Sequence, residues 1–475
     1  MTEFLIANMA PIIFASMIIF LLVGFPVAFA LAANGIVFGL IGIKLGLLGP
    51  QLFQALPDRI FGVMANETLL AVPFFTFMGL ILERSGMAED LLDTIGQLFG
   101  PIRGGLAYAV IIVGALLAAT TGVVAASVIS MGLISLPIML RYGYDKRLAS
   151  GVIAASGTLA QIIPPSLVLI VMADQLGKSV GDMYAGAVIP GLALTGLYVV
   201  YVIIVSFVRP HWVPALPTEA RSLRGTKLLL RVLTTLVPPL MLIFLVLGTI
   251  FLGIATPTEG GAMGASGALI MAIVRKRLNL KLLKQAMEST AKLTTFVLFI
   301  LIGARVFSLT FYGVDGHLWV EHLLVNLPGG QLGFLIVVNI LVFFLAFFLD
   351  YFELSFIVVP LLGPVAEKLG IDLIWFGVLL GINMQTSFLH PPFGFALFFL
   401  RSVAPASVKS SDIYWGAVPF VFIQIIMIGL VIAFPQMVTF NLDKGNNVDA
   451  NSVQIEIPAY EYDNSEPEQP AEQTR

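Results

Sequence analysis

The uncharged stretches of this chain are too long and too apolar for the interior of a soluble domain. Residues 4–43 contain no acidic or basic side chain over 40 positions and are interrupted only by Gly24-Phe25-Pro26. A membrane-spanning helix needs about 20 mostly apolar residues, so this stretch predicts two spans. Over the whole chain 58% of residues are hydrophobic and 11% are charged, whereas about 25% are charged in a soluble domain. We therefore predict an all-α polytopic membrane protein embedded in a lipid bilayer.

The composition also excludes several classes of function. The sequence has no cysteine, which excludes disulfides, thiolate metal sites and cysteine nucleophiles, and only four histidines. A formal net charge of -3 gives no general attraction to nucleic acid. No complete phosphate-binding loop and no metalloprotease or serine-hydrolase motif is present. We expect neither an enzyme nor a nucleic-acid-binding protein, and no cofactor.

The remaining uncharged stretches predict about ten spans and two re-entrant helical hairpins. The first hairpin is expected at 104–140, where the small and polar residues 118–122 interrupt 37 uncharged positions. The second is expected at 331–366, with Asp350 near its tip, and the two hairpins end near Pro137 and Pro360. Other spans are predicted at 67–82, 148–173, 183–208, 232–254, 260–274, 293–311, 373–400 and 413–434.

Lys and Arg predict the orientation, because they concentrate in cytoplasmic loops. Segments 209–231 and 275–284 each hold five of them and are separated by two predicted spans, so both fall on the cytoplasmic side. This assignment places 18 Lys and Arg inside and four outside, namely Lys44, Arg59, Lys178 and Lys368. Both termini are then expected outside the cytoplasm. The first 25 residues have no basic start and no cleavage site, so a retained first span is expected.

The last segment, 441–475, has a different composition. It holds eight acidic and two basic residues and is rich in Asn, Gln, Pro and Glu. Such a segment cannot bury enough apolar surface to fold alone, so we expect a disordered acidic tail. Docking onto a partner is the alternative.

Two segments 227 residues apart have the same pattern. Residues 151–165 and 378–392 both begin apolar, become small and polar, and end in a proline pair, Pro164-Pro165 and Pro391-Pro392. The halves are then 4–208 and 232–434, joined by the basic cytoplasmic linker 209–231. About five spans and one hairpin per half make the second half inverted relative to the first. Inverted repeats with broken helices are typical of secondary transporters.

Proline breaks a helix because it lacks an amide donor and clashes with the preceding turn. Ser156-Gly157-Thr158 and the polar run 383–387 lie one or two turns before the proline pairs, where we expect the backbone to unwind. An unpaired carbonyl in hydrocarbon costs several kcal/mol, which a bound cation or a polar cavity would offset. A proline-kinked helix satisfied by hydroxyl side chains is the alternative.

Four motifs together resemble the large membrane subunit of the tripartite ATP-independent periplasmic (TRAP) transporters. They lie at 119–127 (ATTGVVAAS), 155–166 (ASGTLAQIIPPS), 253–260 (GIATPTEG) and 381–394 (GINMQTSFLHPPFG). The resemblance implies a bacterial inner-membrane protein with a small membrane subunit as partner. It also implies a periplasmic binding protein that delivers an organic acid, uptake driven by a sodium gradient, and an elevator-type motion of a domain carrying the hairpins. The acidic tail goes beyond this family pattern.

On this resemblance we assign two sodium sites, because sodium favours hydroxyl and carbonyl oxygens. The first comprises Thr120, Thr121, Gly122, Ser156, Gly157 and Thr158, and the second comprises Asp350, Asn383, Met384, Gln385, Thr386 and Ser387. Most contacts are expected to come from backbone carbonyls.

The candidate substrate residues are Ser127, Gln161 and Arg305. Arg305 could bind a substrate carboxylate through two parallel hydrogen bonds. A structural ion pair or an outward-reaching side chain are its alternatives. His390, beside Pro391, is expected to be packed like an aromatic residue.

Three other functions are alternatives to a sodium-coupled importer subunit. A stand-alone ion-coupled carboxylate carrier would need no binding protein. An intramembrane enzyme would need paired catalytic groups that the sequence does not show, and a channel would not need two broken-helix repeats. The sequence does not identify which carboxylate is carried.

Overall fold

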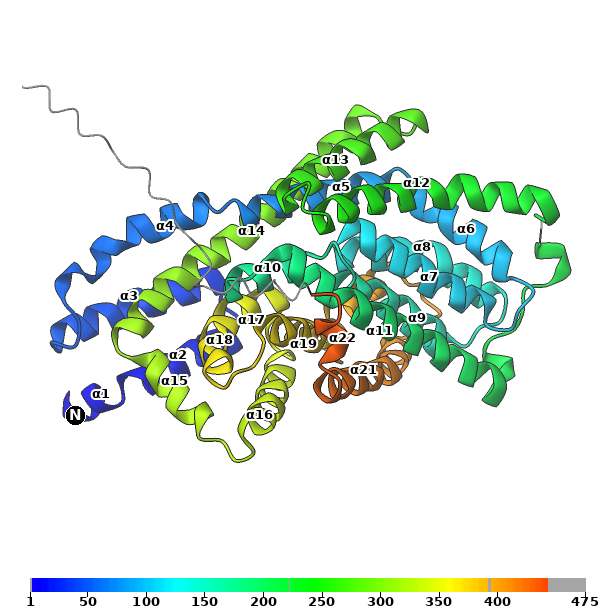
Figure 1. Ribbon diagram of the computed structural model, residues 1–475. Coiled ribbons are helices and arrows are strands. Elements are labelled where there is room, and N and C mark those ends of the chain that lie inside the picture. The colour runs from blue at the N-terminus through cyan, green and yellow to red at the C-terminus, as the bar shows by residue number, and fades with distance from the viewer. Residues whose placement is uncertain (1, 222, 392–393, 443–475) are drawn as a thin grey trace, which may run out of the picture. The chain divides into compact units, whose positions relative to one another are not determined.

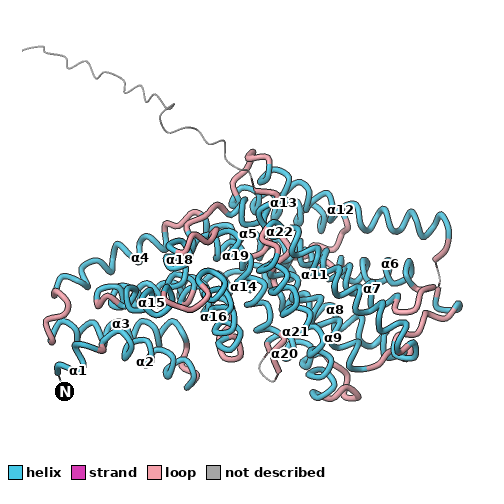
Figure 2. The backbone as a smooth tube through the Cα atoms, turned by 60° about the horizontal axis from the view of Figure 1, so that its bottom comes forward, coloured by secondary structure: helices cyan, strands magenta, loops and turns pink. Residues whose placement is uncertain are grey.

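The structure, a computed structural model, describes residues 2–221, 223–391 and 394–442. These residues form helices and loops and contain no strand (Figures 1 and 2). The first part of the chain forms α1 (Thr2–Ala7), α2 (Met9–Val23), α3 (Val27–Lys44), η1 (Pro50–Ala55), α4 (Leu56–Met64), η2 (Thr68–Leu70), α5 (Ala71–Arg84), α6 (Met87–Phe99), α7 (Gly105–Thr121), α8 (Val124–Arg141), α9 (Lys146–Thr158), η3 (Leu159–Gln161), α10 (Leu167–Leu176) and α11 (Val180–Val208).

The linker and the second part follow. They form η4 (Pro210–Trp212), η5 (Thr218–Ala220), α12 (Gly225–Phe251), α13 (Pro257–Val274), α14 (Leu280–Gly313), α15 (Gly316–Val325), α16 (Gly330–Leu345), α17 (Tyr351–Ile357), α18 (Val359–Lys368), α19 (Leu373–Gln385), η6 (Thr386–Phe388), α20 (Phe395–Val403), α21 (Ser410–Ala433) and α22 (Gln436–Thr439). α12 therefore begins inside the segment predicted as a linker. The acidic tail lies outside the described residues from position 443 onward.

The prediction of an all-helical chain with many apolar spans is confirmed. In the described part, six helices are long and apolar enough to cross a membrane, or up to eight if two bent pairs each form one span. The predicted count was about ten. The difference arises because α2, α7, α10 and α19 are apolar but have at most 17 residues each, and three of these lie where the chain forms a hairpin or breaks.

The two halves repeat the same elements at a constant spacing. α17 begins 227 positions after α8 (351 against 124), as does α19 after α9 (373 against 146) and η6 after η3 (386 against 159). No residue has been inserted or lost between the halves over this region. The same spacing makes Pro364 of α18 the counterpart of Pro137 in α8, which corrects the pairing with Pro360.

Helix packing shows how the halves are related. α9 packs against α21 while its counterpart α19 packs against α11, and α5 packs against α13 while α14 packs against α3. α10 likewise contacts α19, and α20 contacts α9. In each case a helix of one half packs against a helix of the other half, and their counterparts make the equivalent contact. A pseudo-twofold axis between the repeats produces this pattern.

Some of these contacts bring two backbones together without intervening side chains. A Cβ atom at Gly416 of α21 would lie 2.1 Å from the carbonyl oxygen of Arg147, and one at Gly151 of α9 would lie 2.1 Å from the carbonyl oxygen of Gly416. In a membrane the hydrophobic effect does not drive helices together, because lipid tails are as apolar as the side chains. Small residues contribute instead, since they let two backbones approach closely. The pair Gly151–Gly416 therefore fixes the α9–α21 spacing.

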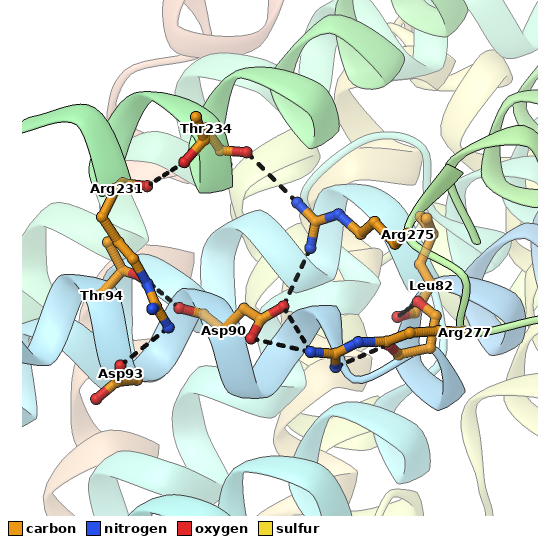
Figure 3. A network of polar contacts seen from close by, with 9 residues as sticks. Leu82, Asp90, Asp93, Thr94, Arg231, Thr234, Arg275 and Arg277 are labelled. Carbon is orange, nitrogen blue, oxygen red and sulfur yellow. Dashed lines mark hydrogen bonds and ion pairs between the residues drawn. The ribbon is translucent and has the colours of Figure 1, made fainter. Parts of the chain in front are cut away.

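A charged network holds α6, the helix between α5 and the first hairpin. Asp90 lies between Arg275 (3.2 Å) and Arg277 (3.4 Å), which come from the connection between α13 and α14 (Figure 3). Asp93 also pairs with Arg231 of α12 at 3.3 Å. Because several charges share the network, it restrains α6 more than a single surface pair would.

We expect Gly416→Ala to lower the free energy of unfolding by about 1–3 kcal/mol, because the added methyl group forces two backbones apart. Gly429→Ala is the matched control, since Gly429 lies on the same helix and a methyl group added there would have nothing within 4 Å of it. Thermal unfolding of both variants in detergent checks this. Equal melting temperatures for the two variants would contradict the packing argument.

Candidate functional site

The first hairpin turns over two residues. α7 ends at Thr121, and Gly122 follows with a φ of 58°, in the left-handed region that glycine tolerates. The Gly122 amide donates to the Ala118 carbonyl at 3.2 Å, and Thr120 donates its hydroxyl to the Leu117 carbonyl at 3.0 Å. A Cβ at Gly122 would lie 3.3 Å from the Pro165 carbonyl. The hairpin tip therefore packs directly on the first broken helix.

The tip of the second hairpin is built around Asp350. Its carboxylate accepts from the Glu353 amide at 2.9 Å, and the Asp350 amide donates to the Glu353 carboxylate at 3.0 Å. This reciprocal arrangement is a capping box, which satisfies the free amides at the start of α17. Asp350 is thus fixed at the tip, and no hydrogen bond in the described residues joins it to the predicted partners at 383–387.

The two predicted broken helices are interrupted at corresponding places. α9 continues into the 3-10 turn η3 and then into an irregular segment at 162–166 that contains Pro164 and Pro165, before α10 begins. α19 continues into η6, Pro391 lies in the turn that follows, and α20 begins at Phe395. Pro392 lies outside the described residues.

The position of the unwinding differs from the expectation. Ser156, Gly157 and Thr158 are still α-helical, as are residues 383–385, and the irregular backbone begins after them. The reason is local, because a proline disturbs only the turn that immediately precedes it. The predicted polar clusters are therefore buried helix ends and not unwound segments.

These two helix ends meet each other. The Gln385 side-chain amide donates to the Thr158 hydroxyl at 2.9 Å, and the two residues are 227 positions apart. Thr158 in turn donates to the Ala155 carbonyl at 2.8 Å. A bond between equivalent positions of two repeats has to lie at their pseudo-twofold axis. The helix-end parts of the first and second predicted clusters, 156–158 and 383–385, therefore meet at the centre of the repeat.

On the same two helix ends and in η6, several buried oxygen atoms have no hydrogen-bond partner among the described residues. They are Ser156 Oγ, Asn383 Oδ1, Gln385 Oε1 and Ser387 Oγ. Buried polar atoms are nearly always paired, so an unpaired group of them marks a place that a ligand or ion would satisfy. Oxygen donors of this kind suit a hard cation.

The other members of the clusters have packing roles or local bonds. Met384 contacts Ser355 through its sulfur at 3.6 Å, and Thr386 donates to the Asn383 carbonyl at 2.6 Å. A Cβ at Gly157 would lie 2.2 Å from a methyl carbon of Val128, so this glycine allows α9 to approach α8.

Asn339 of α16 contacts the end of α19 and was not predicted. Its backbone and side-chain oxygens accept from the Asn383 side-chain amide at 2.7 and 2.9 Å. The sequence did contain one indication of this role. Asn339 is a single side-chain amide in an otherwise apolar helix, and a buried amide needs a polar partner.

A cavity of about 210 Å³ lies where both hairpin tips face α14, and we call it the hairpin-tip cavity. Gly122 and Asp350 line it from the two tips, Gln161 lines it from η3, and Phe296 lines it from α14. The remaining lining residues are mostly apolar and include Leu167, Leu293, Tyr351, Phe352, Phe388, Phe395 and Phe399.

The hairpin-tip cavity is surrounded by helix starts. The first residues of α8, α10, α17 and α20 all line it. Three of these helices have nine or more residues, and a helix N-terminus presents free amides and partial positive charge. Gln161 is 1% exposed, and both polar atoms of its side chain lack a partner in the described part of the chain. This combination suits a small anionic ligand.

The candidate substrate residues do not converge. Gln161 lines the hairpin-tip cavity, Ser127 is buried on α8 without lining it, and Arg305 lines a different cavity.

His390 is packed between Phe343 and Phe347, with ring centroids 4.4 and 4.1 Å away, as expected for an aromatic-like role. The described residues contain no group of three His, Cys, Asp or Glu side chains that could hold a metal ion.

Comparison with known proteins now identifies the family. Residues 14–437 match the family model of the tripartite ATP-independent periplasmic transporter, DctM component. The chain belongs to this family of transporter large permeases. The resemblance noted from the four motifs is thereby confirmed, and so is the expectation of a transporter subunit in place of an enzyme. As its family's description says, the permease is one component of a tripartite system.

Individual relatives agree with this assignment. The C4-dicarboxylate TRAP transporter large permease protein DctM of Pseudomonas aeruginosa is 31% identical over 82% of this chain and 89% of its own length. The ectoine TRAP transporter large permease protein TeaC of Halomonas elongata is 27% identical over 92% of this chain and 99% of its own. The crystal structure of the Alcanivorax borkumensis YdaH transporter shares the fold, with a TM-score of 0.56 at 15% identity over 81% of this chain and 88% of that one.

The Thr158–Gln385 bond should couple the two repeats energetically. In a double-mutant cycle with Thr158→Val and Gln385→Leu, we expect an interaction energy of about 0.5–1.5 kcal/mol in unfolding experiments, as for a neutral buried hydrogen bond. Thr158→Val combined with Gln97→Leu, on the distant helix α6, is the control and should be additive. An additive result for Thr158 and Gln385 would show that the contact carries no energy.

Proposed function

We propose that this permease subunit imports a small organic anion across the bacterial inner membrane, driven by a sodium gradient. A soluble periplasmic binding protein would deliver the anion, and a small membrane subunit would complete the transporter. The observation that carries the proposal is the hairpin-tip cavity, where helix starts and the unpaired Gln161 amide line a small volume. The relatives named for C4-dicarboxylate and ectoine transport support a small organic substrate.

The size and lining of the cavity favour a small carboxylate. Its volume of about 210 Å³ is below the roughly 300–1,000 Å³ of pockets for drug-sized ligands. No Lys or Arg is among its lining residues. A carboxylate would therefore be bound by backbone amides at the starts of α8, α10 and α20 and by Gln161, and not through an ion pair.

Asp350 explains why such a site would require a cation. Asp350 lines the same cavity, so an anionic substrate alone would place a second negative charge near this residue in surroundings of low dielectric constant. A cation bound nearby would offset this repulsion. Substrate binding and cation binding would then favour each other, which is the thermodynamic basis of symport.

Sodium fits the oxygen atoms that the structure leaves unpaired. Ser156, Asn383, Gln385 and Ser387 contribute these buried oxygens from the ends of α9 and α19 and from η6, and they are the residues we assign to hold it. When bound, sodium would supply positive charge that offsets the charge of the anion. The chain's own residues would provide the hydroxyl and amide oxygens that replace its water shell.

The arrangement of elements supports an elevator-type motion. The hairpins and broken helices would form a moving unit, and the paired helices α3–α14 and α5–α13 would form the scaffold. The hairpin-tip cavity lies between them, because Leu293 and Phe296 line it from α14 and the hairpin tips line it from the other side. A substrate held there would move with the hairpins relative to α14.

Sodium should stabilise the purified protein when it replaces potassium at constant ionic strength. A ligand that binds only the folded state adds about 2.7 kcal/mol at 100 times its Kd. We expect a saturable, sodium-specific rise in melting temperature that is lost in Asn383→Ala. Asn34→Ala is the matched control, because Asn34 is also buried, donates its amide to Ser16 and has an unpaired Oδ1. It should lower stability but keep the sodium response, and loss in both variants would contradict the sodium site.

Gln161→Ala should weaken substrate binding during transport. In liposomes containing both membrane subunits and supplied with the binding protein, we expect a roughly 3- to 10-fold loss of succinate uptake at low substrate, the worth of one hydrogen bond. Gln97→Ala removes a half-buried amide elsewhere, whose side-chain oxygen is also unpaired, and should leave uptake unchanged. Equal uptake by the two variants would remove Gln161 from the substrate site. Full uptake without the binding protein would favour a stand-alone carrier.

A further inference from the structure

A second cavity is bounded by α4, α10, α14 and the second hairpin. We propose that it is a receiving site, where Arg59 and Arg305 bind the organic anion before the anion reaches the hairpin-tip cavity. This arginine cavity measures about 310 Å³. It is lined by Arg59, Gln175, Leu301, Ala304, Arg305, Ser308, Leu309, Tyr312, Phe356 and Pro360. The inference rests on the proposed function only for the direction in which the anion moves.

The charge of the arginine cavity is of one sign. Arg59 and Arg305 are its only charged lining residues, and neither has an ion pair or hydrogen bond with another described residue. The nearby carboxylate of Asp174 accepts hydrogen bonds from Asn66 and Gln175 instead. An anion entering this cavity would meet two guanidinium groups that no protein group neutralises.

Other arginines of the chain show the contrast. Arg231, Arg275 and Arg277 each pair with an aspartate of α6 (Figure 3). Ionisable groups within membrane segments are costly and usually serve a function or find a partner. Arg305 lies half-buried in the apolar last third of α14 without such a partner. The ion pair considered for it from the sequence is therefore absent among the described residues.

The cavity also offers the geometry and polarity that a carboxylate needs. Arg305, Ser308 and Tyr312 lie at i, i+3 and i+7 on α14, so their side chains share one face of that helix. Arginine can bind a carboxylate through two parallel hydrogen bonds, and lysine cannot reproduce this fork. Ser308 and Gln175 can contribute further hydrogen bonds to a second polar group of the ligand.

The arginine cavity and the hairpin-tip cavity share the contact between α14 and α17. Phe352 of α17 lines the hairpin-tip cavity and Phe356, one turn later, lines the arginine cavity, and their rings stack with centroids 6.3 Å apart. On α14, Phe296 and Arg305 are separated by about 14 Å at 1.5 Å per residue. The stacked phenylalanines therefore lie between the two cavities. A shift of the second hairpin against α14 would move these two rings and so alter the barrier between the cavities.

The predicted orientation places Arg59 on the outer side of the membrane. An anion released there by a binding protein would first meet the arginine cavity. A site of one charge sign raises the local concentration and arrival rate of an oppositely charged ligand. The cavity would therefore collect the anion before the hairpins bind it.

The cysteine-free sequence allows a direct test with single cysteines. In Ser308→Cys, we expect a methanethiosulfonate reagent carrying a sulfonate to react roughly tenfold faster than one carrying a trimethylammonium group. The preference should disappear when Arg59→Gln and Arg305→Gln are added. Thr295→Cys is the control on the same helix, because it lines a cavity that contains both Lys292 and Glu353, and its rate ratio should not respond to the arginine changes. An unchanged ratio for Ser308→Cys in the double arginine variant would overturn the proposal.

Ligand protection then identifies the kind of anion. In nanodiscs of phosphatidylcholine, succinate should slow the labelling of Ser308→Cys, whereas chloride at equal ionic strength should not. If phosphatidylglycerol protects the cysteine and succinate does not, the arginines bind a lipid headgroup and the proposal is wrong. Equal labelling with and without succinate also overturns it.

Transport adds an independent readout. Arg305→Gln should raise the concentration of loaded binding protein needed for half-maximal uptake at least several-fold, and Arg305→Lys should recover only part of the loss. An unchanged half-saturating concentration in Arg305→Gln would count against the receiving site. A wild-type protein without sodium-dependent uptake would refute the proposed function and leave the labelling result intact, so the two failures can be told apart.

Discussion

The need to pair the polar groups at helix ends governs the centre of this protein. Helices that stop inside apolar surroundings leave amides or carbonyls that require a partner. Four helices begin around the hairpin-tip cavity, and α9 and α19 end against one another through Thr158 and Gln385. At the start of α17, the Asp350–Glu353 capping box supplies the partner from the protein itself. At the other helix starts lining the cavity, no described side chain caps the first amides, which leaves a place for an anion.

The pseudo-twofold relation brings these helix ends together. Each half alone has one hairpin and one broken helix, and the constant spacing of the repeats places corresponding elements face to face. Thr158 and Gln385 therefore come from different halves yet are joined by one buried hydrogen bond, and unpaired oxygens of Ser156 and Gln385 lie on the same two helix ends. In the proposed function, a cation bound at these helix ends would link the halves, while the anion would lie in the hairpin-tip cavity. Such a cation would let this cavity hold an anion although no Lys or Arg lines it.

Local sequence signals predicted the elements well, and they could not predict the contacts between them. Uncharged stretches, proline pairs and the repeat located most of the helices and both interruptions, whereas the re-entrant course of the two hairpins stays a prediction. The exact point of unwinding was missed, because the polar residues at 156–158 and 383–385 remain helical until the turn before the prolines. Asn339 and the separation of Arg305 from Gln161 depend on packing between distant segments, which no local pattern encodes. The number of full-length spans was overestimated because broken helices carry enough apolar residues to resemble complete ones.

The central claim is that a cation at the crossing of the broken helices makes anion binding in the hairpin-tip cavity favourable. Equilibrium binding of radioactive sodium to the purified permease, with and without a saturating organic anion, tests it most directly. Reciprocal coupling requires the anion to raise sodium affinity by the same factor by which sodium raises anion affinity, typically about 5- to 150-fold. A sodium affinity that is the same with and without the anion, in protein shown to bind both, would contradict the account.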